Sequence, residues 1–392
     1  MECNFAPLEG VEKTVPSPGY IFEDSALGEK ITQLRTLLPR CNALCFAMKA
    51  NPFLVDLLEK KVDRFEVCSP GEYEICHARG IDPEKIIVSG VNKTRASMER
   101  ILSLSGGKGI FTIESPLHFE ILEELAAAMD LHISVLIRLS SGNQFGVDRE
   151  SFRGILEKVL KSSHLSFRGI HFFSGTQKKL KRIRKELAML EAFGLELERD
   201  YPLSELELEY GPGLSVAYFE DDKTASSQDQ LTELNGALEE LTAFTSIGIE
   251  MGRFIASSCG FFLTKVMDLK QTDGVNYVIV DGGFHQLHYF GQMMGMKFPA
   301  IRQIPEREGE QTYVLCGSLC SVNDVLVRDI PLKPLEIGDY LLFGTCGAYS
   351  MTEGAALFLS RELPAVYEHT QDGSYRCLRA LSESYAVNTV QK

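Results

Sequence analysis

A lysine that directly follows a short apolar run is the residue whose type and setting most clearly indicate covalent chemistry. The run from Ala43 to Ala47 is followed by Met48 and Lys49. An amine that is partly desolvated at the end of a buried strand can form a Schiff base with a carbonyl compound. A strand-end lysine more often only extends its ammonium group to solvent, so the interpretation of Lys49 depends on the residues that accompany it.

Later apolar runs also end in polar or glycine-rich segments. Glycine turns present backbone N–H groups to phosphate oxygens without an obstructing Cβ, and an arginine beside such a turn adds charge-assisted hydrogen bonds. One such turn usually just permits a tight bend, but several of them together with a lysine indicate a site for an anionic, aromatic cofactor. The residues concerned are Arg138, His171, Ser174, Gly175, Gly211, Gly213, Glu250, Gly252 and Arg253.

These residues lie in, or shortly after, β-type runs, of which the chain has eight. Longer helix-type segments separate the runs. This alternation predicts βα units with a parallel sheet, and a count of eight favours a (β/α)8 barrel. In such a barrel the active site lies at the carboxyl ends of the strands, so the strand-end residues would meet there. The runs are Ala43–Lys49, Arg64–Cys68, Lys85–Ser89, Gly109–Glu114, Ile133–Leu139, Ser166–Phe173, Glu205–Tyr210 and Thr245–Glu250.

A second, all-β domain is predicted after the eighth run, because β-like runs then follow one another without long helices. At 392 residues the chain also exceeds the size at which one core usually stops growing. We expect a cofactor-binding barrel over residues 20–255 and a β domain over residues 256–392 together with 1–19. The β-like runs are Phe261–Met267, Tyr277–Val280, Thr312–Leu315, Asp324–Val327 and Tyr340–Phe343.

Two segments of the predicted barrel have a clear local pattern. Residues 116–129 place apolar side chains at three and four spacing, which predicts a helix with one face in the core. Residues 220–229 are polar and rich in turn formers, which predicts a loop that joins the seventh strand to its helix and is not a domain boundary.

Composition limits the possible partners and surroundings. A formal charge of -14 and a pI near 5.2 disfavour nucleic acid and anionic lipid surfaces as partners. The N-terminus lacks a basic stretch followed by an apolar run, and no apolar segment is long enough to span a bilayer, so we expect a cytoplasmic protein without membrane contact. Ten cysteines occur without a CxxC pair, and neither a metal site nor a disulfide framework is indicated.

Taken in order, these motifs resemble the PLP-dependent group IV decarboxylases, the family that includes diaminopimelate, ornithine and arginine decarboxylases. The resemblance covers nearly the whole chain and implies an alanine-racemase-like (β/α)8 barrel with a C-terminal β-sandwich or β-barrel domain. It also implies pyridoxal 5′-phosphate (PLP) as cofactor and decarboxylation of an amino acid or amino-acid conjugate. The segments that match are 46–51 (FAMKAN), 66–72 (EVCSPGE), 171–175 (HFFSG), 211–213 (GPG), 250–253 (EMGR), 281–283 (DGG), 316–320 (CGSLC) and 347–349 (GAY).

The resemblance also implies a role for individual residues. Lys49 would form the Schiff base with PLP, His171 would stack on the pyridine ring, and Arg138 would contact the side of the phenolic oxygen. Glu250 would pair with the pyridine nitrogen and keep it protonated, so that the ring can accept the electrons released with CO2. The phosphate would be held by Ser174, Gly213, Arg253 and Tyr349, with Gly175, Gly211 and Gly252 beside it.

Cys320 matches the family's cysteine that lies near the substrate Cα and helps to return a proton to it. On its own it would more often be a buried strand cysteine, but it stands in family order in a Cys-x-x-x-Asp pattern with Asp324. In this family the cysteine reaches the active site from the neighbouring subunit. The resemblance therefore implies a homodimer with shared active sites, to which the β domain contributes.

The position after Cys320 departs from the best-known relatives. Diaminopimelate and ornithine enzymes carry an acidic residue there to receive the distal amine of the substrate, whereas this chain has Ser321. A distal ammonium would lose its counter-charge, which disfavours basic amino acids. Diaminopimelate enzymes also place an arginine after the Asp-Ala-Gly-like motif, but 281–289 contains none, and Tyr289 stands near its end. Ser321, Asp324 and Tyr289 are the predicted substrate-side residues.

Two further segments look more like a biosynthetic branch of the family that acts on acylated or conjugated amino acids. They are 291–294 and 352–354. One type in that branch decarboxylates a glutamyl group that is tethered to an acyl carrier protein. The basic segment 178–185 in this acidic chain could dock such an acidic carrier, although a basic segment of this kind is more often only a solvated helix face.

Three alternatives remain open from the sequence. The chain could decarboxylate diaminopimelate or another basic amino acid. It could be an amino-acid racemase, but that family pairs the pyridine nitrogen with an arginine, so Glu250 and Cys320 argue against it. It could also be a non-catalytic decarboxylase homologue, although Lys49, His171, Glu250 and Cys320 are all intact.

Overall fold

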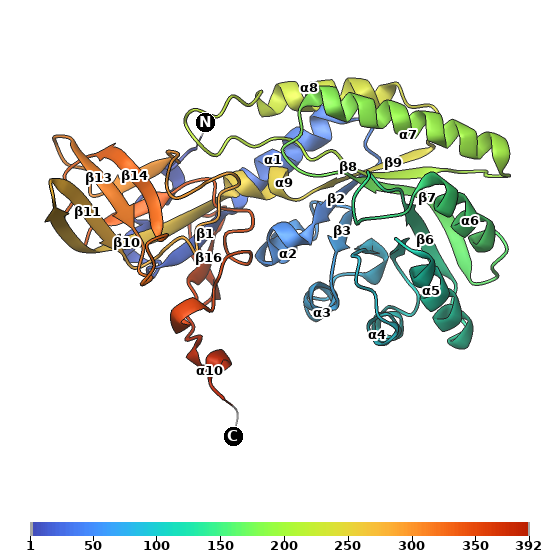
Figure 1. Cartoon of the computed structure of the whole chain (residues 1–392), viewed down its shortest axis with the longest axis horizontal. Coiled ribbons are helices and arrows are strands. Elements are labelled where there is room, and N and C mark those ends of the chain that lie inside the picture. The colour runs from blue at the N-terminus through green and yellow to red at the C-terminus, as the bar shows by residue number, and fades with distance from the viewer. Residues whose placement is uncertain (1–2, 391–392) are drawn as a thin grey trace. The chain divides into compact units, whose positions relative to one another are not determined.

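The computed structural model describes residues 3–390, and these residues form two compact units. The first, here called the barrel unit, comprises residues 31–215 and 225–254. The second, here called the β unit, comprises residues 3–30, 216–224 and 255–390. Figure 1 shows the ribbon of the whole chain, with the helices and strands labelled.

A closed barrel of eight parallel strands lies at the centre of the barrel unit. Each strand pairs with the next along the chain, and the first and last pair with each other, so all eight predicted runs and the predicted fold class are confirmed. The strands are short and rich in apolar residues because parallel strands are covered on both faces. They are β2 (Ala43–Ala47), β3 (Arg64–Val67), β4 (Ile86–Val88), β5 (Ile110–Ile113), β6 (Ile133–Arg138), β7 (Leu165–Phe173), β8 (Glu207–Gly211) and β9 (Ser246–Met251).

Helices cover the outside of the barrel, and α7 and α8 run side by side (Figure 1). The predicted helix at 116–129 is confirmed as α5, where Ser115 caps the first turn by accepting a hydrogen bond from the backbone N–H of His118. The helices assigned to this chain are α1 (Asp24–Leu37), α2 (Val55–Leu58), α3 (Pro70–Ala78), α4 (Arg95–Ser105), α5 (Pro116–Ala128), α6 (Arg149–Val159), α7 (Leu180–Asp200), α8 (Ser227–Glu239), α9 (Arg253–Ala256) and α10 (Tyr385–Asn388).

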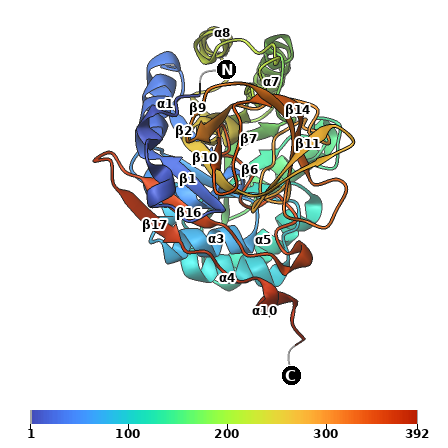
Figure 2. The ribbon, with the colours of Figure 1, turned by 90° about the vertical axis from the view of Figure 1, so that its left-hand side faces the viewer.

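The β unit is built on a mixed sheet of nine strands. Strand β1 lies inside it, antiparallel to β10 and parallel to β16, and Figure 2 shows β1, β16 and β17 side by side. The sequence analysis missed β1, β12, β16 and β17. The strands are β1 (Gly19–Glu23), β10 (Gly260–Thr272), β11 (Val275–Val280), β12 (Ile301–Ile304), β13 (Gln311–Cys316), β14 (Val325–Leu332), β15 (Tyr340–Phe343), β16 (Ala365–His369) and β17 (Tyr375–Arg379).

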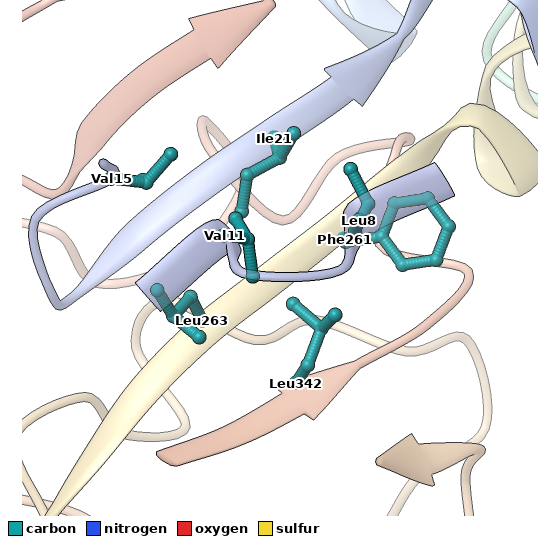
Figure 3. Packing of buried hydrophobic residues seen from close by; sticks show 7 residues of the cluster. All are labelled: Leu8, Val11, Val15, Ile21, Phe261, Leu263 and Leu342. Atoms are coloured by element: carbon teal, nitrogen blue, oxygen red, sulfur yellow. The ribbon is translucent and has the colours of Figure 1, made fainter. Parts of the chain in front are cut away.

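The N-terminal segment is held in the β unit by an apolar cluster (Figure 3). Its two short 3₁₀ turns bury side chains against strands from three other parts of the chain, which fixes the segment before β1 begins. The cluster consists of Leu8, Val11, Val15, Ile21, Phe261, Leu263 and Leu342.

The observed units differ from the predicted domains at two places. Residues 20–30 belong to the β unit because β1 is hydrogen-bonded to β10 and β16. Residues 216–224, which overlap the predicted loop 220–229, leave the barrel unit, join the β unit and return. Phe219 forms a β-bridge with Pro299 there, so this stretch does more than join a strand to its helix. No helix within residues 3–390 is long and apolar enough to cross a membrane.

Candidate active site

Lys49 lies at the carboxyl end of β2, in a 3₁₀ turn that runs from Met48 to Ala50. Its Nζ atom is 2.6 Å from Glu66 Oε2 and 3.5 Å from Glu250 Oε1. Burial alone would lower the pKa of Lys49, but Glu66, followed by Cys68 and Glu250, outweighs it and raises the pKa well above its ordinary value. The resting amine is therefore protonated, and its side chain remains 32% exposed at the barrel mouth.

Glu66, to which no role was assigned from the sequence, is the acidic residue nearest to Lys49. It is the last but one residue of β3 and is 2% exposed, and its second oxygen accepts hydrogen bonds from the Cys68 thiol at 2.8 Å and from the Ser89 hydroxyl. The only signal in the sequence was its place in the matched segment 66–72. Because Glu66 is the nearest base to Lys49, it can take the proton that the amine must lose before it becomes a nucleophile.

Glu250 sits on β9 and connects the lysine to a histidine. His171 Nε2 lies 3.2 Å from Glu250 Oε2, and both side chains are at most 4% exposed. Burial alone would raise the pKa of Glu250, but Lys49, His171 and Arg138 lower it to about 2. Glu250 is therefore an anion over the whole physiological range. His171 Nδ1 is buried without a hydrogen-bond partner.

Arg138 ends β6 and belongs to a neighbouring buried group. It donates to Glu114 at 3.1 Å, its guanidinium lies 4.9 Å from the centre of the Phe145 ring, and its Nε is buried without a partner. Lys93 donates to Thr112 Oγ1 at 3.1 Å and lies 3.8 Å from Glu114. Burial lowers the pKa of Lys93 to about 8, although Glu114 opposes this. The barrel mouth thus holds a second amine that the sequence analysis did not single out.

A glycine cradle, consisting of Gly175, Gly211 and Gly213, lies where β7 and β8 end. Gly213 has a φ of +60°, and a Cβ there would come 2.1 Å from the carbonyl oxygen of Gly175. A Cβ on Gly211 would come 2.6 Å from the Phe173 ring, whereas the space beside Gly175 is open. The backbone at these positions can therefore approach a ligand closely.

Gly252 and Arg253 follow β9 directly. A Cβ on Gly252 would lie 2.9 Å from Ala50 Cβ, which explains why a glycine stands next to the lysine turn. Arg253 is buried, and its Nε donates to Thr176 Oγ1 at 3.2 Å. The arginine is thereby held beside the loop that carries Ser174 and Gly175.

Ser174 is part of a buried ionic cluster. Its hydroxyl donates to Glu186 at 2.5 Å and accepts from Lys178 Nζ at 3.1 Å, and Tyr210 donates to the same glutamate at 2.9 Å. Lys178 is 4% exposed and is 2.6 Å from Glu186. The prediction that the basic segment 178–185 is a surface is therefore wrong for Lys178, because this lysine turns inward to neutralise a buried carboxylate.

The predicted residues of the β unit lie in three loops, one of which carries Cys320. Cys320 is exposed and Ser321 is half-buried. Asp324 is 3% exposed, and it accepts hydrogen bonds of 2.7 Å from the backbone N–H groups of Phe284 and Leu319. Both carboxylate oxygens of Asp324 thus accept hydrogen bonds from the backbone. We therefore interpret Asp324 as a structural residue that stabilises the loop carrying Cys320.

The other predicted residues of the β unit have contrasting settings. Tyr289 is 4% exposed, donates to the carbonyl of Gly344 at 2.7 Å and packs on the ring of Tyr218, which is the setting of a core residue and not of a substrate contact. Tyr349 is half-buried and has a φ of +69°, a conformation that non-glycine residues adopt rarely.

The barrel mouth fits the expected PLP. The lysine offers an amine and the ionised glutamate offers an anion. The glycine cradle and the adjacent arginine offer hydrogen-bond donors for a phosphate group. The buried atoms Arg138 Nε and His171 Nδ1, which have no partner within the described residues, are donors or acceptors available to a ligand. The open space beside Gly175 leaves room for a group at the cradle.

Comparison with known proteins supports this chemistry. Diaminopimelate decarboxylase from Pseudomonas aeruginosa is 30% identical over 335 residues, which are 78% of this chain and 76% of that protein. L-glutamyl-[BtrI acyl-carrier protein] decarboxylase from Niallia circulans is 25% identical over 411 residues, 97% of this chain and 94% of that protein. The crystal structure of diaminopimelate decarboxylase from Helicobacter pylori with L-lysine shares the fold, with a TM-score of 0.83 at 23% identity over 97% of this chain and 98% of that one.

The family model described as "Pyridoxal-dependent decarboxylase, pyridoxal binding domain" matches residues 25–257, more than half of the chain. These residues include every barrel strand and the whole lysine, glutamate and glycine arrangement described above. The chain therefore belongs to the pyridoxal-dependent decarboxylases, and it is a carboxy-lyase that uses pyridoxal 5′-phosphate.

Proposed function

We propose that this enzyme decarboxylates an amino acid that lacks a free distal ammonium group and is carried on an acyl carrier protein, with Lys49 as the residue that binds the cofactor. The observation that carries the cofactor assignment is the geometry of Lys49, whose amine lies between the carboxylates of Glu66 and Glu250. The substrate assignment rests on Ser321 and on the basic start of α7. The L-glutamyl carrier-protein decarboxylase, which aligns over almost the whole chain, supports the same direction.

The barrel residues divide the work of holding PLP. Bound PLP supplies an electron sink for the electron pair that CO2 leaves behind. Glu66 accepts the proton that Lys49 releases, and Glu250, as a permanent anion, holds a proton on the ring nitrogen. The glycine cradle, Ser174 and Arg253 would bind the phosphate, and Tyr349 is proposed as a further phosphate ligand. Arg138 contacts the side of the phenolic oxygen.

Cys320 is proposed to deliver a proton to the substrate Cα in the active site of a partner subunit. Within one chain, Cys320 is exposed and Val322, two residues further on, is 88% exposed. An apolar side chain that projects from a loop braced by Asp324 is typical of a segment that is covered by another protein surface. A homodimer would bury this loop and complete two active sites.

Mixing two inactive variants tests the shared active site. Lys49→Ala and Cys320→Ala are each expected to lack activity alone, although each retains its fold. If the sites are shared, a mixed dimer carries one intact site, and random reassociation should restore about a quarter of the wild-type activity. Mixtures that stay as inactive as the separate variants would show that Cys320 acts within its own chain or not at all.

The carrier protein is proposed to dock on the basic helix start, which consists of Lys179, Lys181 and Lys185. These side chains are exposed, whereas Lys178 is buried and Arg184 is paired with Glu233 on α8. The chain as a whole is negatively charged and would repel an acidic carrier, so a local cationic patch is needed for encounter.

Charge reversal separates docking from chemistry. Lys181→Glu with Lys185→Glu should raise KM for a carrier-bound amino acid about tenfold and spare the free amino acid, because only the carrier contacts the patch. Lys161→Glu, an exposed lysine that precedes β7 at the opposite end of the barrel, is the matched control. An equal effect on both substrates, or none, would reject docking at this helix.

Diaminopimelate decarboxylation is the second candidate, because several relatives carry that activity. A panel of free diaminopimelate, ornithine, lysine and glutamate beside carrier-bound glutamate distinguishes the two. Faster CO2 release from diaminopimelate than from every other substrate would replace the first proposal.

A further inference from the structure

Phe173 ends β7 two residues after His171, and the two side chains share a face of the strand. Side chains alternate along a strand, so both point to the side opposite Phe172. The Phe172 ring stacks on Tyr210 at 6.3 Å and 16°, and Tyr210 binds Glu186 of α7, so that side is the helix layer. His171 and Phe173 therefore face the barrel interior, with Phe173 nearer the mouth.

His171 lies one level deeper than Phe173 in the barrel. Its neighbour across the sheet on β8 is Glu209, whereas the neighbour of Phe173 is Gly211 of the glycine cradle. His171 is 1% exposed and its Nε2 is engaged with Glu250 at 3.2 Å. A residue at that depth, with its ring edge turned to Glu250, is placed to orient the carboxylate.

The Phe173 ring lies between the two ends of the proposed cofactor site. Its centre is 5.8 Å from Lys49 Nζ and 5.9 Å from Lys178 Nζ, which donates to the carbonyl of Gly211 in the cradle. The ring is half-buried, and the missing Cβ of Gly211 lets it lie against the end of β8. A flat ligand that joins Lys49 to the cradle would pass over this ring.

We infer that Phe173, and not His171, covers one face of the pyridine ring of PLP, and that His171 is a positioning residue for Glu250. The inference rests on the proposed location of PLP between Lys49 and the glycine cradle. A phenyl ring offers an apolar stacking face but no N–H group, lone pair or titratable proton. The protonation of the ring nitrogen is then left to Glu250, whose orientation depends on His171.

Cofactor binding to the apoprotein tests the role of Phe173. Phe173→Leu keeps an apolar side chain but removes the ring, and it should weaken the affinity for PLP roughly fivefold to tenfold. The induced circular dichroism of the cofactor band should also change, since that signal depends on the ring's immediate surroundings. Phe172→Leu removes the same ring on the helix side and is the matched control, with PLP affinity and dichroism expected within about twofold of wild type.

His171→Asn tests the second half of the inference. It should leave the affinity for PLP within about twofold, because its ring does not carry the stacking contact. It should move the acid limb of the cofactor's absorbance–pH profile to higher pH, because His171 helps to hold the pKa of Glu250 low. Loss of affinity and of dichroism in His171→Asn, with Phe173→Leu unchanged, would overturn the inference.

Two further measurements keep the outcome interpretable. Borohydride reduction of the wild-type enzyme, followed by peptide mass analysis, shows whether PLP is bound at Lys49. If it is not, the proposed site fails as a whole; if it is, and Phe173→Leu binds PLP like wild type, only the role of Phe173 fails. Melting of each apoprotein shows whether a loss of affinity is merely a loss of fold.

Discussion

Two ionic clusters stand at opposite ends of the same barrel, and each places a cation between two carboxylates, with Arg168 as a second partner of Glu207 in the first. At the amino ends of the strands, Arg64 contacts Glu207 and lies 2.8 Å from Glu209. At the carboxyl ends, Lys49 lies 2.6 Å from Glu66 and 3.5 Å from Glu250. The charges are similar, but the cations are of different kinds.

The kind of cation decides what each cluster can do. The guanidinium of Arg64 keeps its proton at any pH at which the protein is folded. Its cluster can therefore stabilise the fold through ion pairs but cannot supply a nucleophile. The amine of Lys49 can release its proton to Glu66 and then react. In barrels of this type the amino-terminal face serves stability and the carboxyl-terminal face serves catalysis, and the two cations follow that division.

The carboxylates also differ between the two ends. The pKa of Glu209 is raised to about 8, mainly by burial. Arg64 lowers this pKa, whereas the nearby negative charges of Glu250 and Glu207 raise it. The pKa of Glu250 is held at about 2, because Lys49, His171 and Arg138 all face it. Equal burial thus leaves one carboxyl group neutral and the other ionised, and only the ionised one can hold a proton on a cofactor.

The sharpest test of the comparison exchanges the reactive cation for a fixed one. Lys49→Arg keeps a positive charge between Glu66 and Glu250, so the apoprotein should melt within a few degrees of wild type. A guanidinium cannot take the place of the amine, so CO2 release should fall below detection and borohydride should fix no PLP at residue 49. Substantial activity in this variant would contradict the assignment of Lys49.

The next largest effect is expected at Glu250. Glu250→Gln retains the shape but not the charge, so kcat should fall roughly 100-fold while PLP remains bound at Lys49. Steady-state assays together with the absorbance of the bound cofactor measure both quantities. A kcat within about threefold of wild type would mean that another group protonates the ring nitrogen.

The converse exchange at the other end should affect stability and not chemistry. Arg64→Lys removes the guanidinium whose Nη1 contacts both Glu207 and Glu209, so the free energy of unfolding should fall by about 1–3 kcal/mol. Denaturant titration measures the loss. Because Arg64 pairs with Glu207 and Glu209 and not with the carboxylates beside Lys49, kcat of the folded variant should remain near the wild-type value, and a large drop in kcat would refute the division of labour.

The smallest predicted effect is a change in the pH dependence of stability. The folded-state pKa of Glu209 is raised to about 8, so the protonated carboxyl group favours the folded state. That stabilisation is fully present below the unfolded pKa of about 4.3 and is lost as pH rises through about 8. Glu209→Gln cannot ionise, so its free energy of unfolding should decrease with rising pH by roughly 1–2 kcal/mol less than that of the wild type. The free energy of unfolding is measured at several pH values for both proteins. An equal change of this free energy with pH in the two proteins would contradict the prediction.

Much of the fold follows from local sequence patterns. The eight apolar runs and the helix at α5 are continuous in sequence, so periodicity alone locates them. The strand β1 was missed because its place is set by pairing with β10 and β16, more than 230 residues away. The same applies to 216–224, whose partner Pro299 is distant in sequence.

The candidate site was predictable only in part. Lys49, Glu250 and the glycine cradle end strands in recognisable motifs, and the structure brings them to one barrel mouth. Lys178 could not be separated from its exposed neighbours, because burial inside a run of like charges depends on where Glu186 lies. Tyr289 was predicted near the substrate, yet its hydroxyl is used within the core of the β unit.

The order of apolar runs and strand-end motifs in the sequence by itself determined the barrel and the cofactor class, and it singled out Lys49 as the proposed reacting lysine. Only the tertiary structure decided which acidic group faces that lysine, which of two neighbouring rings on β7 lies at the mouth, and which carboxyl groups are ionised. The physical reason is that a motif is a local property of the chain, whereas proton affinity and ring exposure depend on charges and solvent that distant segments bring together.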